Sequence, residues 1–183
     1  MYRPLRNTIF GRPMQQGTGV LVLWEHVLLN TKFSRIIELG TGWGGLSLYF
    51  ALWCEERGAK FHTFDIAKKW KDTPLAKMIC LASYFHVLDV LHNPQPIKEL
   101  IVRPGPSIVF CDNGDKREEF RQLAPILKPG DIIGVHDWGR EIGRRDVTDV
   151  MVDHLLDVIE LDLCRITDSH TRLFKKREIS CEC

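Results

Sequence analysis

The feature that most constrains the fold of this chain is a repeated pattern, in which a short apolar run is followed by a segment whose apolar residues have helical spacing. Short apolar runs of this kind indicate buried strands, and the segments between them indicate helices. Strands that alternate with helices form βαβ units, because two parallel strands need a crossover connection. The pattern therefore predicts an α/β chain with a mostly parallel sheet and helices on both faces.

We expect five parallel strands, which cover residues 35–39, 60–65, 86–89, 107–112 and 131–137. The helices expected before, between and after them cover residues 17–29, 44–57, 74–84, 116–127 and 147–156. Two further strand candidates, residues 158–165 and 171–175, are separated by a turn too short for a parallel crossover, so we expect them to pair antiparallel. The predicted fold is Rossmann-like, a doubly wound, mostly parallel sheet of about seven strands with an antiparallel final strand.

Length and composition fit one folded domain, since the chain has 183 residues, of which 44% are hydrophobic and 27% charged. No repeat or linker divides it, so we predict a single domain over residues 1–183, with an N-terminal segment and helix (1–30) and a Rossmann-like core (35–177). The net charge of +1 lacks the positive excess of a generic nucleic-acid binder. The basic clusters at residues 68–71, 140–145 and 175–177 are interpreted as solvated faces, with contact to an anionic substrate as the alternative.

Features of membrane or secreted proteins are missing from the sequence. The longest apolar run near the start, residues 20–24, is far shorter than the roughly 20 residues of a membrane-spanning helix. The first six residues lack the apolar core of a secretion signal. The six cysteines are scattered without a Cys-x-x-Cys pair, unlike zinc sites or disulfide frameworks. We therefore expect reduced thiols, a cytoplasmic location and no membrane partner.

A glycine-rich loop follows the first parallel strand and reads Glu38-Leu39-Gly40-Thr41-Gly42-Trp43-Gly44-Gly45. Glycines allow a tight turn and a close approach of a ligand, and the start of the next helix presents backbone N–H groups to an anion. Gly40, Gly42 and Gly45 match the G-x-G-x-x-G pattern of dinucleotide enzymes. One interpretation of the loop is therefore that the protein is a nicotinamide-dependent oxidoreductase.

Glu38 favours a different ligand, because its carboxylate would repel a pyrophosphate at close range. A ligand that carries an ammonium group beside its own carboxylate fits better, and the methionine part of S-adenosylmethionine has both. Asp65, at the end of the second parallel strand, can accept hydrogen bonds from both hydroxyls of a ribose. The structural alternatives are a solvated strand-end residue for Glu38 and a helix N-cap for Asp65.

Residues 37–45 resemble the first motif of class I S-adenosylmethionine-dependent methyltransferases. Further stretches are similar to the cephalosporin hydroxylase-like branch, which also contains sugar O-methyltransferases. These stretches are residues 11–16, Gly44-Gly45, and residues 109–115 leading through 127–130 to 135–138. The resemblance spans residues 10–177 and implies binding of S-adenosylmethionine and, often, of a divalent metal.

The resemblance also assigns roles to individual residues. The expected cofactor-binding residues are Glu38, Gly40, Gly42, Trp43, Gly44, Asp65 and Asp89. Glu38 and the loop glycines hold the methionine end, Asp65 the ribose, and Asp89 the exocyclic amine of the adenine. Trp43 either stacks on the cofactor or packs within its loop. Asp89 either binds the adenine or is an ordinary residue at the end of a strand.

A second group of polar residues follows two strands that we expect to be neighbours. Asp112 ends one strand and His136-Asp137 ends the next, and carboxyl ends of parallel strands are where such sheets bind ligands. An alcohol is a poor nucleophile until it loses its proton, so a base or a hard cation beside the methyl donor would assist its methylation. We expect Asp112 and Asp137 to bind Mg²⁺ or Mn²⁺.

The general base is a separate question. Members of the family usually have an acidic-acidic or acidic-amide pair where this chain has His136-Asp137, and often a His or Lys where it has Asp115. His136 and Asp115 are therefore the candidate catalytic bases. The structural alternative is that His136 makes only hydrogen bonds and that Asp137 caps the following helix.

These observations predict an S-adenosylmethionine-dependent methyltransferase that transfers a methyl group to a hydroxyl of a small-molecule acceptor. The alternatives are a nicotinamide-dependent oxidoreductase and a non-catalytic S-adenosylmethionine-binding protein. Family analogy also implies a homo-oligomer, because little of the chain is left to form a lid over an acceptor.

Overall fold

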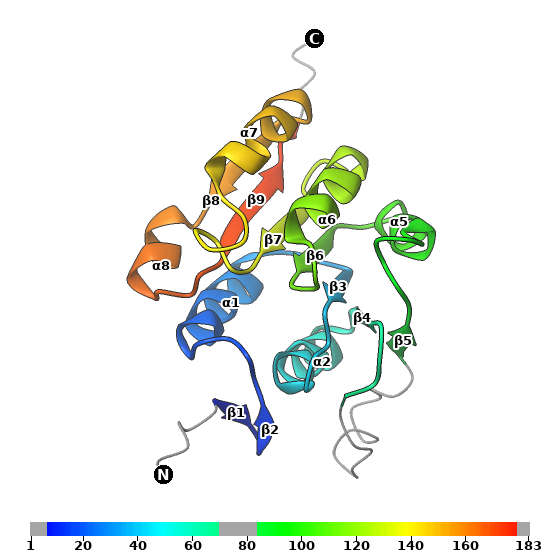
Figure 1. Cartoon of the computed structure of the whole chain (residues 1–183), viewed down its shortest axis with the longest axis vertical. Coiled ribbons are helices and arrows are strands. Elements are labelled where there is room, and N and C mark those ends of the chain that lie inside the picture. The colour runs from blue at the N-terminus through cyan, green and yellow to red at the C-terminus, as the bar shows by residue number, and fades with distance from the viewer. Residues whose placement is uncertain (1–6, 70–83, 179–183) are drawn as a thin grey trace.

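The computed structural model describes residues 7–69 and 84–178. Its main sheet contains β3 (Arg35–Leu39), β4 (Lys60–Asp65), β5 (Phe85–Val87), β6 (Ser107–Cys111), β7 (Ile132–Val135), β8 (Leu156–Ile159) and β9 (Arg172–Lys176). The helices are α1 (Gly19–Asn30), α2 (Gly45–Arg57), α5 (Gln95–Ile101), α6 (Lys116–Leu123), α7 (Arg144–Asp153) and α8 (Leu161–Ile166), with a 3-10 turn η1 (Ala124–Ile126). A small hairpin, β1 (Thr8–Ile9) and β2 (Arg12–Pro13), precedes them (Figure 1).

The strand order of the main sheet is β5-β4-β3-β6-β7-β9-β8. Neighbouring strands from β5 to β7 are parallel, and β9 is antiparallel to both β7 and β8. This confirms the predicted Rossmann-like class with its antiparallel final strand. Because parallel strands end at the same edge of a sheet, the segments after β3, β4, β6 and β7 meet at the carboxyl edge.

The two faces of the sheet pack against different helices. All five residues of β3 are buried, as are those of β6, which is typical of strands covered on both sides. On one face, the Trp24 ring of α1 meets Phe50 and Phe110 edge to face, with centroids 5.1 and 5.2 Å apart. On the other face, Phe120 of α6 packs on Phe174 of β9 at 5.1 Å. The sheet is thus held rigidly between two hydrophobic layers.

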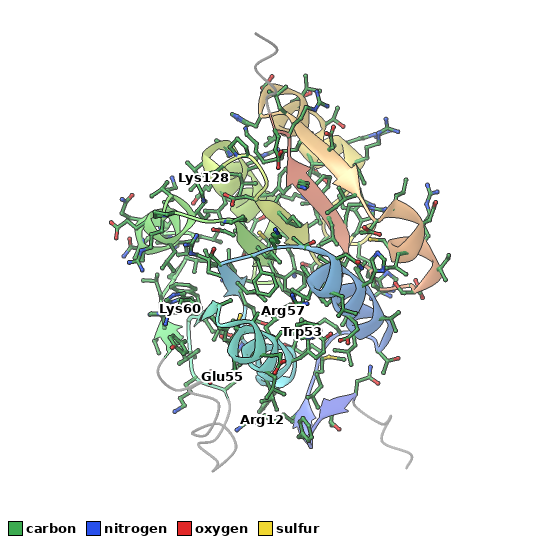
Figure 2. The ribbon with its side chains drawn as sticks, turned by 180° about the vertical axis from the view of Figure 1, so that it is seen from behind. Arg12, Trp53, Glu55, Arg57, Lys60 and Lys128 are labelled. Carbon is green, nitrogen blue, oxygen red and sulfur yellow. The ribbon has the colours of Figure 1, made fainter. Side chains whose placement is uncertain are left out.

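The outer side of α2 is polar and faces solvent. Figure 2, which shows the molecule from behind, labels Trp53, Glu55 and Arg57 along this helix. The Arg57 guanidinium lies 5.3 Å from the centroid of the Trp53 ring. The opposite side of α2 carries Ser47 into the interior, toward the first polar cluster described below.

The buried cysteines agree with the expectation of reduced, structural thiols. Cys54, Cys111 and Cys164 are free and buried. Burial raises the pKa of the Cys54 thiol to about 12, so this thiol stays protonated and unreactive. Among residues 7–69 and 84–178, no helix combines the length and the hydrophobicity needed to cross a lipid bilayer.

Three parts of the described chain differ from the sequence-based expectation. The predicted strand at residues 158–165 is a strand only as far as Ile159. The positive φ of 51° at Glu160 turns the backbone out of the sheet, and α8 follows. Helix α5 was not predicted, since the prolines at its start resemble a loop, although proline also suits the first turn of a helix. The hairpin β1–β2 was not predicted either. The expected helix at residues 74–84 lies almost wholly outside the described residues.

Candidate functional site

The first polar cluster lies where β3 and β4 end and is centred on Glu38. This carboxylate is almost completely buried. Its Oε2 atom accepts hydrogen bonds from the hydroxyls of Ser47 on α2 and of Thr63 on β4, the latter at 2.6 Å. Burial raises the pKa of Glu38 to about 8, although both hydrogen bonds oppose the shift. Glu38 is therefore held in one orientation by the protein and is not a solvated strand-end residue.

At two positions of the loop, the backbone conformation explains why the residue is glycine. Gly40 has a φ of 96°, and a Cβ there would lie 2.2 Å from the backbone oxygen of Asp112. This close approach brings the ends of β3 and β6 together. Gly44 also has a left-handed backbone, with φ of 79°, and forms the N-cap of α2. Both residues are thus required by the turn itself, whatever ligand the loop binds.

A segment from the N-terminus lies across the same loop. Residues 13–16, here called the N-terminal strap, come so near that a Cβ on Gly45 would lie 2.4 Å from the Pro13 carbonyl oxygen. A Cβ on Gly42 would lie 2.4 Å from Oε1 of Gln15. The cavity enclosed by the strap, Glu38 and the loop has a volume of about 10 Å³. Such a volume holds about one water molecule, so the strap fills most of the space over the loop.

Asp65, the expected ribose ligand, is buried at the end of β4. Its Oδ2 atom accepts a hydrogen bond of 2.9 Å from the backbone N–H of Gly42, which ties the glycine loop to the neighbouring strand. Its Oδ1 atom accepts a longer bond from the Ala67 N–H, and the Lys69 ammonium lies 3.7 Å away. Asp65 therefore has the position expected from the sequence, beside the glycine loop.

Asp89 and Trp43 are more exposed than Asp65. The Asp89 carboxylate is exposed and accepts hydrogen bonds from the backbone N–H groups of Leu91 and His92. It also lies 2.8 Å from Nδ1 of His92, and the hydrogen bonds to His92 lower the pKa of Asp89. These contacts stabilise a local turn after β5, which supports the alternative given above for Asp89. Trp43 is 42% exposed at the surface of the glycine loop.

The second polar cluster lies where β6 and β7 end and contains Asp112, His136 and Asp137. The His136 Nδ1 atom is 3.1 Å from Oδ1 of Asp112 and 3.4 Å from Oδ2 of Asp137. One potential ligand atom from each of the three residues lies within 4.8 Å of the others. Asp137 adopts a left-handed backbone with φ of 54°, which is uncommon for a residue other than glycine. The structure therefore brings together the three residues that the sequence places at these strand ends.

A buried lysine completes this cluster. The ammonium group of Lys116, in the first turn of α6, lies 3.0 Å from Oδ2 of Asp137 and 2.7 Å from Oε2 of Glu141. It is also 4.0 Å from Oδ1 of Asp112. In the structure it supplies the positive charge that keeps these carboxylates close together.

The charges of the cluster determine its protonation. Burial alone would lower the pKa of His136, but its hydrogen bond to Asp112 and the two carboxylate charges raise it above the ordinary value. Burial alone would raise the pKa of Asp137, but Lys116 and His136 lower it. The pKa of Lys116 is raised, because its bonds to Glu141 and Asp137 outweigh the effect of burial. Lys116 is therefore a fixed cation and not a base, whereas His136 is an imidazole whose protonated form the two carboxylates favour.

Asp115 has a different position from the one that a catalytic base would need. Its exposed carboxylate caps the start of α6 by accepting hydrogen bonds from the N–H groups of Arg117 and Glu118, at 3.2 and 3.1 Å. Within the described residues, no hydrogen bond or ion pair joins it to Asp112, His136 or Asp137. The placement thus favours His136 of the two predicted bases.

Gln16 is a member of the site that the sequence-based reasoning did not single out. Its side-chain amide is buried and donates a hydrogen bond to Oδ2 of Asp112. The N-terminal strap thereby connects the glycine loop to the second cluster. Only the position of Gln16 within the stretch 11–16, which carries part of the family resemblance, could have indicated it.

The donor atoms of the second cluster fit a divalent cation. Two carboxylates and an imidazole nitrogen within 4.8 Å of one another are suitable ligands for Mg²⁺ or Mn²⁺, with the nitrogen favouring softer ions. Lys116 occupies the same negative region, so a bound metal would compete with its ammonium group for Asp137. The fit therefore rests on the donor set, and Lys116 is the group that a metal must outcompete.

The strand order and the glycine loop can be compared with solved structures. A structure of CmcI with Mg-SAM superimposes with a TM-score of 0.68 at 15% identity, covering 97% of this chain and 79% of that one.

Two other solved structures show the same fold. A structure of CmcI with S-adenosylhomocysteine gives a TM-score of 0.65 at 14% identity, over 95% of this chain and 84% of that chain. A Clostridium thermocellum protein, described as a candidate rRNA methylase, gives 0.56 at 14% identity over 90% of this chain and 99% of that chain. No protein-family model and no curated protein matches the sequence. These likenesses confirm the Rossmann-like fold that the sequence predicts.

Proposed function

We propose that this chain is an S-adenosylmethionine-dependent methyltransferase that methylates a hydroxyl group of a small molecule. The observation that carries the proposal is the arrangement along one edge of the sheet. Glu38 and Asp65 lie beside the glycine loop, and Asp112, His136 and Asp137 lie after the next two strands. A cofactor site and a cluster suited to proton transfer are therefore neighbours.

In this proposal each cluster has its own task. Glu38 and the loop bind the methionine end, and Asp65 binds the ribose hydroxyls. S-adenosylmethionine, when bound, supplies the methyl group and leaves as a neutral thioether. His136 accepts the proton of the acceptor hydroxyl, so that the oxygen can form its bond to the methyl carbon. Asp112 holds the His136 ring through the Nδ1 hydrogen bond and keeps the base in place.

A divalent metal, where present, would be held by Asp112 and Asp137 and would lower the pKa of the acceptor hydroxyl. The fit rests on the Asp-His-Asp donor set and the short distances within it. The structure of CmcI with Mg-SAM supports this part of the proposal by analogy of fold alone. Lys116 compensates the two carboxylates when the metal is not bound.

The decisive experiment compares three ligands on the full chain. Thermal unfolding is followed with S-adenosylhomocysteine, NAD and NADP at equal concentrations. S-adenosylhomocysteine at about 100 times its dissociation constant should stabilise the fold by about 2.7 kcal/mol. A shift of the melting temperature with S-adenosylhomocysteine alone supports the proposal. A shift with NAD or NADP alone would overturn it in favour of an oxidoreductase.

A further inference from the structure

A second concave site lies away from the glycine loop, between α7, β8, α8 and β9. These elements lie together toward the C-terminal part of the chain, in gold to red in Figure 1. The cavity has a volume of about 720 Å³, which is within the range of small-molecule sites. Its apolar lining includes Val147, Met151, Leu155, Leu156, Val158 and Phe174. An apolar surface of this size is suited to an apolar body of a ligand, and neither the glycine-loop residues nor Asp112, His136 and Asp137 line it.

The charged lining of this cavity has one sign. Arg144, Arg165, Arg172 and Arg177 line it, and no Asp or Glu does so among the described residues. Arg177 pairs with Asp157 at 2.6 Å, and Arg165 lies 3.8 Å from Asp162. In the described part of the chain, neither Arg144 nor Arg172 has a carboxylate partner. The cavity is therefore electrostatically complementary to an anion.

Among the arginines that line the cavity, Arg172 has a buried hydrogen-bond donor without an acceptor in the part of the chain that the structure describes. Its guanidinium lies over the Trp138 ring, 5.1 Å from the centroid, which fixes its plane. Its Nη1 atom is buried and has no hydrogen-bond acceptor among the described residues. A buried donor without an acceptor is unfavourable, whereas a planar guanidinium binds carboxylate, sulfonate or phosphate oxygens strongly. Arg172 also lines the cavity, so an anionic group bound there would meet its guanidinium.

The backbone places Arg172 and Trp138 at one end of the cavity. Arg172 begins β9 and is paired with Val135, the last residue of β7. Trp138 follows shortly after β7, and its backbone N–H donates to the His170 carbonyl just before β9. Arg172 and Trp138 thus lie at the carboxyl edge of the sheet. The apolar lining continues from there toward Leu156 and Arg177, near the opposite end of β9.

We propose that this cavity binds an amphipathic organic anion, a small molecule with an apolar body and one carboxylate, sulfonate or phosphate group. The anionic group binds Arg172 above Trp138, and the apolar body lies against α7 and β8. The argument uses neither Glu38 nor the Asp112 cluster, so the proposal stands or falls independently of the methyltransferase function.

The test uses decanoate as the probe, titrated into the full chain by calorimetry below its micelle concentration. Decanol and decyltrimethylammonium at equal concentration are the neutral and cationic comparisons. Decanoate is expected to bind with one site per chain, and at least about tenfold more tightly than either comparison, because charge-assisted hydrogen bonds discriminate by this order. Equal binding of decanol would overturn the proposal, since it would show an apolar surface without anion recognition.

Three variants separate the site from general charge effects. Arg172→Met should weaken decanoate binding about tenfold or more. Arg145→Met removes an equal charge from an exposed position of α7 that does not line the cavity, and should leave binding unchanged. Val158→Glu places a negative charge on a side chain that is 40% exposed, and should abolish binding without loss of the fold. Unfolding curves check the fold of each variant. Wild-type affinity in folded Arg172→Met would overturn the proposal.

Discussion

The ends of β3 and β4 differ from the ends of β6 and β7 in how they hold their carboxylates. Glu38 and Asp65 accept hydrogen bonds from neutral donors, namely two hydroxyls and backbone N–H groups, and Lys69 lies at a longer 3.7 Å from Asp65. Asp112 and Asp137 are held mainly by charged or chargeable groups, Lys116 and His136. Neutral donors can stay in place when a ligand binds, whereas a cation must move when a second cation arrives. The carboxylates of the first region can therefore keep their hydrogen bonds when a ligand binds. In the second region, a bound metal ion would have to replace Lys116 beside the carboxylates.

The largest effect is expected when the second region loses a carboxylate. Asp112→Asn or Asp137→Asn should abolish metal-stimulated methyl transfer, a loss of about 100-fold or more. Binding of S-adenosylhomocysteine should stay nearly intact, because Glu38 and Asp65 are unchanged. The measurement is turnover of a hydroxylated acceptor with Mg²⁺ or Mn²⁺ and with EDTA.

Asp115→Asn is the matched control for these variants, since asparagine can also cap α6. It should retain activity. If EDTA leaves wild-type activity unchanged, the metal assignment is wrong and His136 acts as a metal-free base. If Asp115→Asn alone is inactive, Asp115 and not His136 is the base.

Removing the internal cation tests the replacement of Lys116 by a metal ion directly. Lys116→Gln should lower the melting temperature in EDTA, because loss of one partner from a buried charged pair costs about 3–5 kcal/mol. In a domain of this size, 1 kcal/mol corresponds to about 2–4 °C. Added Mg²⁺ or Mn²⁺ should restore more stability to Lys116→Gln than to the wild type. Equal metal-induced shifts in both proteins would contradict competition between Lys116 and a metal.

The first region is tested with Asp65→Ala. The variant removes the acceptor that we propose for the ribose hydroxyls, together with the bond from the Gly42 N–H. Affinity for S-adenosylhomocysteine, measured by calorimetry, should fall at least about tenfold, since hydrogen bonds to charged groups contribute about 1.5–3 kcal/mol each. Asp89→Ala should cost less, because the Asp89 carboxylate is exposed and already bonded within its own turn. Unchanged affinity in folded Asp65→Ala would refute the ribose assignment.

The smallest effect concerns Glu119 of α6, a third carboxylate that neither region uses. It is buried, and no side chain of the described residues donates a hydrogen bond to its carboxylate. Burial raises its pKa to about 8, partly offset by the backbone amide of Asn113. The unfolded chain loses this proton near the ordinary pKa of about 4.5. Between these pH values only the folded state keeps the proton, so Glu119 lowers stability as pH rises.

Glu119→Gln removes this titration. Relative to the wild type, the melting temperature of the variant should rise by about 2–4 °C at pH 8. The two proteins should differ little at pH 4.5, where the carboxyl is protonated in the folded state and half protonated in the unfolded state. A difference that does not grow with pH would show that Glu119 is already ionised in the folded protein.

The sequence was sufficient for features that depend on local patterns. Alternating strands and helices predict the parallel sheet, and the register of β6 and β7 then necessarily brings Asp112 near His136. Contacts between distant segments were not predictable in this way. The bond from Gln16 to Asp112 joins residues 96 positions apart, and no periodicity indicates it. Helix α8 was mistaken for a strand, because a short segment that mixes apolar and charged residues fits both structures until the backbone turn at Glu160 is known.

The N-terminal strap would add a second equilibrium to the proposed cofactor binding at the glycine loop. The space that Gln15 and Gln16 leave against this part of the loop is about 10 Å³, so a ligand that needs more room there would bind only chains in which the strap has moved. The measured affinity is then the intrinsic affinity multiplied by the fraction of such chains. With a fraction of about 1%, the dissociation constant would be about 100 times weaker than the intrinsic one. Substitutions in the strap would therefore tune cofactor affinity without touching a cofactor contact, and the hydrogen bond from Gln16 would transmit the same movement to Asp112.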